Sequence, residues 1–570
     1  MTSSEEEPVH IRNDRLDRLR AEQSDIGNHV IDEFVAGHIN RRGFLRAGAL
    51  VGISTPVLSA VLAACGSSSS PGASSSSGGG AAGATIKAGI VTPAGAINPV
   101  TVADQGGLDM LGQTGEYLCL SDQTLTLKPV LATSWSSNST FDVWTFKIRQ
   151  GVKFHNGAAL TADDVVYTYK LQTNPHGKGA ALSAFGGVLA PAGVQKVDDF
   201  TVAFHLTAPN GNFPYLTSSD NYNMIILPNN QDPAKWESTF TGTGPFKLHS
   251  YTQKTGAAFV RNEDYWGTKA IPAATQFTFY DTDTPAILAL TSGSLDVLGQ
   301  FSVTGGEQLL AGGYNVVKLK SSAHRELSMR CDQAPFTDPR VRQALALSLD
   351  RSAIVSALFK GNADIGNDSP FAPVYPSTDT GVAQRSLNVA KAKALLSAAG
   401  HPSGFSATLT GETFQEIPAY AQIIQQSAKA IGVNLKLNIE AQPKYYGNYL
   451  FGTSDWLDAT LSLVDYGHRG VPNVFLTAPL QTTNSKTGTG AWNAAHFKNA
   501  DYDRLSAQYI ATGDLSSQRN IAGQIETLLL AQTPIIYGYF YNYLTASAKN
   551  VTGAYPTAVG HIFLNNCHKA

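Results

Sequence analysis

The interpretation of this chain depends on one segment, Val143-Trp144-Thr145-Phe146-Lys147-Ile148-Arg149-Gln150-Gly151-Val152-Lys153-Phe154-His155-Asn156-Gly157. Apolar and polar residues alternate from Val143 to Ile148, which predicts a strand with Trp144 and Phe146 facing a core. The residues from Val152 to Gly157 predict a second strand that is closed by a turn.

A helix is predicted shortly after this segment. Thr161 is a capping residue, and Asp164 supplies the carboxylate three residues later that a capping box requires. The helix would run from Val165 to about Leu171. Further strands of this half are expected at Thr85–Val91, Glu116–Leu120, Leu125–Val130, Asp199–Leu206 and Ala258–Arg261. Strands separated by Pro-, Asn- and Gly-rich loops favour an α+β fold here.

Helices and strands alternate in the second half of the chain. Asp338 and Asn388 are N-capping residues, and Gly400 and Gly432 stand where a helix commonly ends in a left-handed backbone. The expected helices are Pro339–Ser348, Asp350–Phe359, Ala390–Ala399, Ala419–Ile431 and Ser517–Ala531, and the expected strands are Val433–Ile439 and Ile535–Leu544. This alternation favours an α/β fold.

Length and composition limit the class of protein. The chain has 570 residues, which exceeds the roughly 250–300 residues at which a single core stops growing, so at least two domains are expected. It is 43% hydrophobic and 15% charged, with a net charge of −3. Because a nucleic-acid-binding protein would show a basic excess, we expect no nucleic-acid partner.

The segment before Cys65 has the parts of a secretory signal. Arg41 and Arg42 form a positive head, Ala47–Ala64 is a weakly apolar run, and small residues lead to Cys65. The run is close to the minimum of about 17 residues for a spanning helix. Arg41-Arg42-Gly43-Phe44-Leu45 resembles the twin-arginine export motif, and Leu62-Ala63-Ala64-Cys65 resembles the lipobox of bacterial lipoproteins. The alternative is one N-terminal membrane helix with a chance cysteine behind it.

We therefore expect residues 1–64 to be a cytoplasmic leader and a removed signal. Cys65 would be acylated and would hold the protein at the outer face of the cytoplasmic membrane, on the periplasmic side. The residues after it, up to Ala84, are almost only Ser, Gly and Ala, so residues 65–84 would be a lipidated cysteine with a flexible tether. Such a tether has a root-mean-square reach of roughly 25 Å.

Cysteines are otherwise sparse. Besides Cys65 the chain has Cys119, Cys331 and Cys567, an odd number without CxxC spacing. We therefore expect neither a metal site nor a disulfide framework, while a single bridge among these cysteines stays open.

Seven strings, in order, resemble the family-5 extracellular solute-binding proteins of ABC importers, a group that includes oligopeptide-, dipeptide- and nickel-binding components. The first reads Leu127-Lys128-Pro129-Val130-Leu131-Ala132-Thr133-Ser134-Trp135. The others are Trp144–Gly157 with Leu160–Val165, Gly242–Leu248, Arg261–Gly267, Ala289–Val297, Pro335–Ala344 and Ala390–Leu396. One such string is weakly specific, whereas the ordered series is strongly specific. The resemblance extends from about residue 85 to residue 570.

The resemblance implies an α/β fold with an α+β first lobe, in which two lobes joined by a hinge form a clamp like that of periplasmic binding proteins. Lobe I would take residues 85–320, including an extra subdomain, and the returning tail 542–570. Lobe II would take residues 321–541. The ligand would lie between the lobes and stabilise their closure.

The resemblance also implies a candidate site. Peptide binders of the family bind the solute's α-ammonium with an aspartate, and the matching position in Leu461–Gly467 is Asp465, followed by Tyr466. The alternative is that Asp465 caps a turn before Gly467. The next residues, His468–Asn473, depart from the family's usual short loop.

A second departure concerns the solute's carboxylate. Dipeptide binders hold it with an arginine, but the corresponding loop, Gly411–Pro418, contains neither Arg nor Lys. A free dipeptide would therefore need another partner, such as Arg469. Longer peptides, or solutes without a carboxylate, fit this loop better.

Aromatic residues are further candidates for ligand contact. Tyr445 and Tyr446 lie where lobe II of the family often contacts the ligand, and Trp492 could line the cleft. Tyr449 is expected at a half-exposed edge and Trp456 in the core.

The competing class is a secreted enzyme that is exported folded. The chain shows no Gly-x-Ser-x-Gly, His-Glu-x-x-His or phosphate-binding glycine pattern, and its 13 histidines are scattered. We therefore expect no catalysis, no cofactor and no metal ligands, in a monomer that delivers a peptide-like solute to a membrane permease driven by a separate ATPase. A sugar or a chelated metal such as nickel remains the alternative cargo.

Overall fold

The computed structural model describes residues 28, 30, 31, 83–177, 179–484 and 489–570. Of the described residues, 83–290 and 295–570 belong to one compact unit. The predicted export residues Arg41 and Arg42, the predicted lipidation site Cys65 and most of the predicted tether lie outside the described residues. Among the described helices, none combines the length and the apolar character that crossing a membrane requires.

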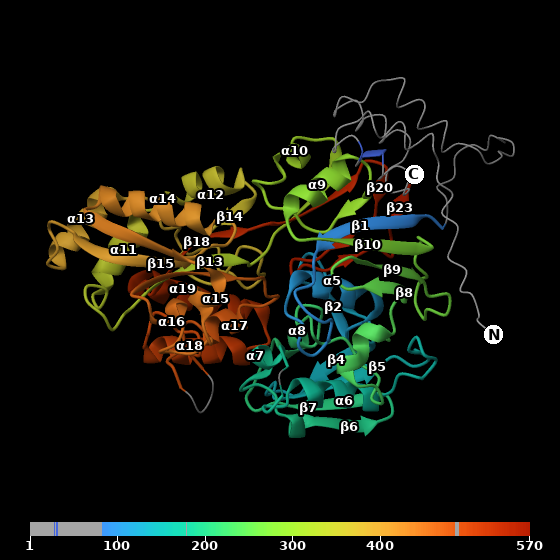
Figure 1. The fold of residues 1–570 in the computed structure, drawn as a ribbon. Coiled ribbons are helices and arrows are strands. Elements are labelled where there is room, and N and C mark those ends of the chain that lie inside the picture. Colours follow the sequence, from blue (N-terminus) through green and yellow to red (C-terminus); the bar gives the residue numbers. More distant parts are fainter. Residues whose placement is uncertain (1–27, 29, 32–82, 178, 485–488) are drawn as a thin grey trace, which may run out of the picture. The chain divides into compact units, whose positions relative to one another are not determined.

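The first lobe is built on a seven-stranded mixed sheet, shown in Figure 1 with β1, β8, β9 and β10. β1 pairs in parallel with β10 and with β11, whereas β8 and β9 are antiparallel neighbours. Its strands, in spatial order, are β12 (Tyr314–Leu319), β19 (Tyr543–Ala548), β11 (Val297–Leu298), β1 (Thr85–Val91), β10 (Ala274–Tyr280), β9 (Gly256–Arg261) and β8 (Phe246–Thr252). The sheet thus joins strands from the beginning, the middle and the end of the chain.

A four-stranded antiparallel sheet forms the extra part of this lobe. Its spatial order is β4 (Ala132–Ser137), β5 (Val143–Ile148), β7 (Thr201–His205) and β6 (Val194–Asp198). The predicted strand at Val143–Ile148 is confirmed, and Trp144 and Phe146 are buried in the core as expected. The helix α6 (Ala162–Gln172) follows, and the Asp164 carboxylate accepts a hydrogen bond from the Thr161 backbone N–H at 2.8 Å.

The predicted strand at Val152–Gly157 is wrong. This segment folds back on itself, because the Phe154 N–H donates to Ala158 O and the Gly157 N–H donates to Phe154 O. Only a single bridge, between Lys153 and Ala159, forms there in the described structure. Apolar and polar residues do alternate in this segment, but the chain turns before the segment can pair with a neighbouring strand.

Smaller elements complete the first lobe. They are the helices α5 (Gln105–Thr114), α7 (Leu182–Phe185), α8 (Phe213–Leu216), α9 (Asp283–Thr291) and α10 (Glu307–Leu310), the 3-10 turns Pro191–Gly193 and Pro233–Ser238, and the strand pairs β2 (Cys119–Ser121) with β3 (Leu127–Pro129), β20 (Val551–Thr552) with β23 (His568–Lys569) and β21 (Tyr555–Pro556) with β22 (Ile562–Phe563). Cys119, Cys331 and Cys567 are free thiols.

The second lobe is built on a six-stranded mixed sheet. Its spatial order is β14 (Ala363–Ile365), β18 (Ile535–Tyr541), β13 (His324–Met329), β17 (Leu461–Tyr466), β15 (Phe405–Glu412) and β16 (Val433–Glu440). Its helices are α11 (Pro339–Leu347), α12 (Arg351–Phe359), α13 (Val389–Ala398), α14 (Ile417–Ala430), α15 (Gln442–Tyr446), α16 (Asp455–Asp458), α17 (Asn473–Thr477), α18 (Ala500–Ala511) and α19 (Leu515–Gln532). In Figure 1, α12 and α14 lie on one side of this sheet and α15 and α16 on the other.

The predicted helix starts in this lobe are confirmed. The Asp338 side chain accepts from the Arg340 N–H, Asp350 accepts from the Ala353 N–H, and Asn388 accepts from the Lys391 N–H. The predicted strand Ile535–Leu544 is interrupted at Asn542, so that β18 belongs to the second lobe and β19 to the first. The chain therefore passes directly from one large sheet to the other at this point.

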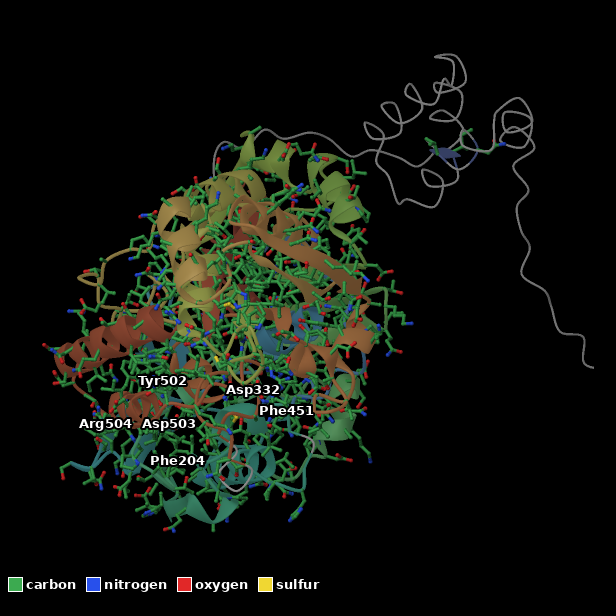
Figure 2. All side chains as sticks on the ribbon, turned by 90° about the vertical axis from the view of Figure 1, so that its left-hand side faces the viewer. Phe204, Asp332, Phe451, Tyr502, Asp503 and Arg504 are labelled. Carbon is green, nitrogen blue, oxygen red and sulfur yellow. The ribbon has the colours of Figure 1, made fainter. Side chains whose placement is uncertain are left out.

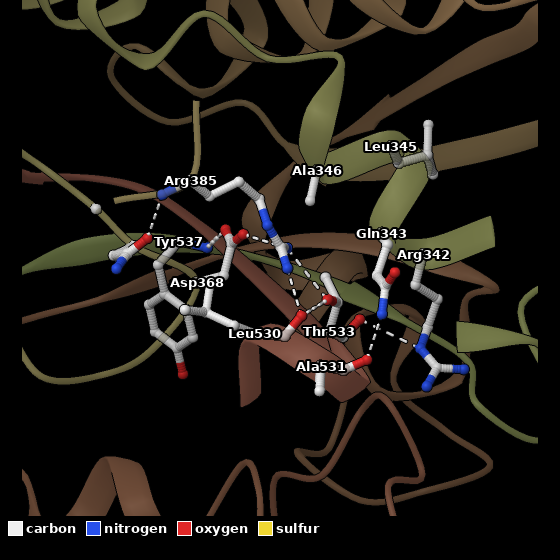
Figure 3. A network of polar contacts seen from close by, with 12 residues as sticks. Arg342, Gln343, Leu345, Ala346, Asp368, Arg385, Leu530, Ala531, Thr533 and Tyr537 are labelled. Carbon is white, nitrogen blue, oxygen red and sulfur yellow. Dashed lines mark hydrogen bonds and ion pairs between the residues drawn. The ribbon is translucent and has the colours of Figure 1, made fainter. Parts of the chain in front are cut away.

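A buried polar network fixes the second lobe, as Figure 3 shows. The Asp368 carboxylate is fully buried and pairs with Arg351 and with Arg385, each at 2.6 Å. It also accepts a hydrogen bond from the Tyr537 backbone N–H at 3.3 Å. Because two guanidinium groups share this one buried carboxylate, the network ties α12, a loop and β18 together through a single counter-ion.

Candidate functional site

Asp465, the predicted receptor for an ammonium group, lies in β17 beside a buried arginine. Arg325 of β13 is opposite it in register, is fully buried, and forms an ion pair with Asp465 Oδ1. The Tyr541 hydroxyl donates to the same oxygen at 3.4 Å. The Asp465 side chain remains 26% exposed, so solvent reaches its carboxylate.

Arg325 serves a second carboxylate as well. Its Nε lies 2.9 Å from Glu416 Oε1, and its guanidinium stacks on the Tyr541 ring with 4.5 Å to the centroid. Two carboxylates, Asp465 and Glu416, therefore share one guanidinium, which leaves one negative charge uncompensated. A positively charged group would be stabilised at this face.

Glu412 extends this acidic face. Its carboxylate accepts hydrogen bonds from the Tyr446 hydroxyl and from Gln442 Nε2, each at 2.6 Å. Burial raises the pKa of the Glu412 carboxyl, and the hydrogen bond from Tyr446 opposes this increase. The loop Gly411–Pro418, in which the sequence shows no cation, thus contributes one carboxylate, Glu416, that binds an arginine from another strand.

The predicted aromatic residues form one connected group. Tyr446 is half-buried and stacks on Tyr449, which is 63% exposed, with ring centroids 5.6 Å apart. Tyr445 is fully buried behind Tyr446, and its hydroxyl donates to Leu463 O at 3.0 Å. Trp456 is buried in the core, as predicted. Tyr445 therefore fixes the position of Tyr446 from behind.

Tyr466 and Trp492 form the other half of this group. Tyr466 is buried, and its ring lies 5.9 Å from that of the half-buried Trp492 and 5.7 Å from that of His324. The structure thus brings Tyr445, Tyr446, Tyr466 and Trp492 into one cluster. Asp465 precedes Tyr466 in β17, so its side chain points to the other face of the sheet, where it contacts Arg325.

Asp332 lies outside the acidic face at Asp465 and has a structural role. Its carboxylate binds Arg330 through two hydrogen bonds of 2.8 and 2.9 Å and lies 3.1 Å from His496 Nδ1. The hydrogen bonds from Arg330 lower the pKa of the Asp332 carboxyl to about 2. Figure 2 shows Asp332 and Phe451 near each other, and His496 joins them through a ring contact of 5.3 Å with Phe451. These interactions are structural.

The two lobes contact each other through buried amide side chains. Asn212 of the first lobe donates to Asn473 Oδ1 at 3.0 Å and accepts from Gln518 Nε2 at 3.0 Å. Asn473 in turn donates to Asn210 Oδ1 at 3.3 Å. The Gly211 N–H also donates to Ile510 O at 2.8 Å. These hydrogen bonds join the two lobes in this structure.

A pocket of about 30 Å³ lies beside this contact and receives side chains from both lobes. The first lobe contributes Tyr215, Leu216 and Asp220, and the second contributes Arg469, Gly470 and Val474. In the part of the chain that the structure describes, no group of three or more His, Cys, Asp or Glu side chains is placed to hold a metal ion.

Residues 126–468, more than half of the chain, match the family model for the middle region of bacterial extracellular solute-binding proteins, family 5. The chain belongs to this family. The chain is similar to the Bacillus subtilis dipeptide-binding protein DppE, with 27% identity over 77% of this chain and 83% of the relative.

Solved structures of similar proteins share the two-lobed fold. The Helicobacter pylori periplasmic binding protein DppA, in complex with the peptide STSA, has a TM-score of 0.69 and 20% identity, and the match covers 85% of this chain and 98% of that chain. HbpA2 from Haemophilus parasuis has a TM-score of 0.74 and 22% identity over 85% of this chain and 100% of that chain. This solute-binding protein therefore has the expected clamp architecture, and its family consists of extracellular binding proteins.

Sequence reasoning missed several charged residues of this family-5 protein. Arg325 stands in His324-Arg325-Glu326, three ionisable residues at the start of a strand that is buried throughout, and ionisable residues in such a strand indicate a buried polar network. Asp220 lies in a polar loop, Thr217–Asn223, that is indistinguishable from a surface loop by composition alone.

Proposed function

We propose that this chain is a lipid-anchored receptor of an ABC importer that closes its two lobes on a peptide-like solute and delivers it to a membrane permease driven by a separate ATPase. The observation that carries the proposal is the acidic face at Asp465. Two carboxylates share one buried guanidinium there, and the Tyr541 ring stacks on that guanidinium. This arrangement favours a solute that carries an ammonium group beside apolar or aromatic parts.

Each predicted site residue has a place in this proposal. Asp465 takes the solute's ammonium, since its Oδ1 is held by Arg325 while the carboxylate remains accessible. Tyr446, Tyr466 and Trp492 form the aromatic wall, and Tyr445 positions Tyr446. The chain supplies the binding and the closure, and no catalytic step is assigned to it.

The division into lobes is part of the proposal. Lobe I takes residues 85–320 with the tail 542–570, and lobe II takes residues 321–541. The membership of the strands supports this division, since β12 and β19 belong to the seven-stranded sheet whereas β13 and β18 belong to the six-stranded sheet. Closure of such a clamp is stabilised when a solute contacts both lobes.

The export and anchoring of the receptor rest on the sequence. Arg41 and Arg42 direct twin-arginine export, Cys65 is acylated, and residues 66–84 tether a monomer near its permease on the periplasmic side of the membrane. Cys65→Ser tests the anchor. The variant should leave the membrane fraction for the soluble extracytoplasmic fraction, whereas retention in the membrane would contradict lipidation at Cys65.

Thermal unfolding of the purified chain tests the choice of solute. A ligand at 100 times its dissociation constant adds about 2.7 kcal/mol to the free energy of unfolding. Pools of peptides of two to eight residues should raise the melting temperature, while a neutral sugar and chelated nickel should not. A shift produced only by the sugar or by the metal complex would contradict a peptide-like solute, and turnover of any added compound would favour an enzyme.

A further inference from the structure

The small pocket between the lobes contains a buried carboxylate, and one oxygen of this carboxylate accepts no hydrogen bond. Asp220 follows α8 in the first lobe and is 8% exposed. Among the residues that the structure describes, none donates a hydrogen bond to its Oδ2. A buried carboxylate oxygen without a donor is costly, and such groups normally bind a hydrogen-bond donor or a cation. A solute can therefore supply the hydrogen-bond donor that Oδ2 of Asp220 lacks.

The opposite wall of the pocket is a glycine. A Cβ at position 470 would overlap Oδ2 of Asp220, so any larger residue there would push the carboxylate aside. Gly470 thus lets the loop of the second lobe close directly over Asp220. The pocket of about 30 Å³ that remains admits only a compact group.

Arg469 presents a positive charge to the same pocket. The backbone that carries it is held at several points: Ser322 Oγ accepts from the Arg469 N–H at 3.0 Å, and the Tyr375 hydroxyl donates to Arg469 O at 2.8 Å. The neighbouring His468 is buried, and its Nδ1 accepts from the Ser322 N–H at 2.9 Å. The loop is therefore preorganised before a solute binds.

The guanidinium of Arg469 retains hydrogen-bonding capacity. Its Nη1 donates to His468 O at 2.9 Å, and within the described part of the chain it forms no ion pair with a carboxylate. A planar guanidinium binds a carboxylate through two parallel hydrogen bonds, for which it is better suited than an ammonium group.

We propose that Asp220 and Arg469 form a subsite for a zwitterionic group of the solute, an ammonium and a carboxylate on the same carbon atom, with the ammonium at Asp220 and the carboxylate at Arg469. Both charges then have a partner of opposite sign, whereas a solute with only one charged group would leave one of them unpaired. The small volume requires the two groups to be close together, as they are at the α-carbon of an amino acid. The subsite rests on the proposed function, because a solute must bind between the lobes, but it does not depend on Asp465.

Two isomeric dipeptides test this subsite in the full chain. γ-Glutamylglycine keeps the ammonium and a carboxylate on one carbon, whereas in α-glutamylglycine that carboxylate is consumed by the peptide bond. The isomers have the same mass and the same charged groups. Titration calorimetry should show that the γ isomer binds at least 10-fold more tightly than the α isomer.

Variants of the pocket should remove this preference. Asp220→Asn and Arg469→Gln should each bring the two affinities to within about 2-fold, because each leaves one charge of the γ isomer unpaired. Gly470→Ala should have the same effect without changing a charge, since its methyl group displaces the Asp220 carboxylate. Asp501→Asn and Arg504→Gln, on the exposed surface of α18, are the matched controls and should retain the preference.

Folding of the variants is checked by thermal unfolding without ligand. Asp220→Asn should not lower the melting temperature, because it replaces a buried carboxylate whose Oδ2 accepts no hydrogen bond, whereas a structural role for Asp220 would make the variant less stable. Equal affinities of the two isomers for the wild type, or a γ preference that survives in Asp220→Asn, would overturn the subsite. Binding of other peptides without binding of the γ isomer would also overturn it while leaving the proposed function intact. Failure of every peptide to bind would overturn both.

Discussion

Arg325 lies fully buried opposite Asp465 and forms an ion pair with it, so the carboxylate that is predicted to bind the solute already has a cationic neighbour. The pair alone would be neutral. Glu416 adds a second carboxylate, because it binds the same guanidinium at 2.9 Å. The three side chains Arg325, Asp465 and Glu416 together therefore carry a negative charge. The acidic face therefore depends on residues from three different strands or loops.

Asp465→Asn should weaken the binding of an amine-bearing solute by about 10- to 100-fold, because a charge-assisted hydrogen bond is replaced by a neutral one. Calorimetric titration measures the effect. Asp501→Asn, which also removes an aspartate paired with an arginine but on the exposed face of α18, is the control. Unchanged affinity in Asp465→Asn would remove Asp465 from the site.

The buried Asp220 should make stability depend on pH. Burial raises the pKa of its carboxyl to about 7, and the polar side chain of Ser121 and the positive charge of Arg469 oppose this. In the unfolded chain the pKa of an aspartate is about 3.9, so between pH 4 and pH 7 the folded chain binds more protons than the unfolded chain. The contribution of Asp220 to the free energy of unfolding is therefore complete below about pH 4 and is lost as the pH rises through 7. Between pH 4 and pH 8 the free energy of unfolding of the wild type should fall by about 2–4 kcal/mol relative to that of Asp220→Asn, as measured by urea unfolding.

The same titration should affect binding in the opposite direction. An ammonium group binds the ionised form of Asp220, so the affinity for γ-glutamylglycine should increase from pH 6 to pH 8. The other ionisable groups that face Asp220 are Arg469, Tyr117, Cys119, Tyr215 and Tyr375. Burial raises the pKa of Cys119 and of Tyr215 to about 12, and it raises the pKa of the other tyrosines further, so none of these groups titrates in this range. An affinity that is constant from pH 6 to pH 8 would contradict ammonium binding at Asp220.

The Asp368 network should dominate the stability of the second lobe. Asp368→Asn leaves Arg351 and Arg385 without their buried counter-ion and should lower the free energy of unfolding by about 3–5 kcal/mol. Urea unfolding measures this loss. Asp501→Asn, whose pair with Arg504 is exposed, should change it by less than about 1 kcal/mol. A similar small change for Asp368→Asn would show that the network is dispensable.

The amide contact between the lobes should favour the closed state. Asn473→Ala removes the hydrogen bonds to Asn210 and Asn212, which should cost closure about 1–3 kcal/mol and weaken solute binding by about 10-fold or more. Asn434→Ala, at an exposed position of β16, is the control. If Asn473→Ala binds as tightly as the wild type, these bonds do not contribute to closure.

Local features of the fold could be predicted from the sequence. The caps at Thr161, Asp338 and Asn388 depend on residues two or three positions apart, and they form as predicted. The error at Val152–Gly157 has a long-range cause, because whether an alternating segment becomes a strand depends on a partner elsewhere in the chain.

The site was less predictable, because its charges come from distant segments. Asp465 could be named from its motif, but its partner Arg325 is 140 residues away in the sequence. The pocket joins Asp220 and Arg469 from different lobes, and no local pattern reports that these two side chains meet. Burial and pairing between lobes decide the chemistry of this site, and both are properties of the folded chain.

Mass spectrometry of the small molecule released by denaturing the natively purified protein tests the central claim most directly. The account predicts a peptide-like compound with a free ammonium group, present at about one molecule per chain. A sugar, or a metal complex that lacks an amine, found in that amount would contradict it.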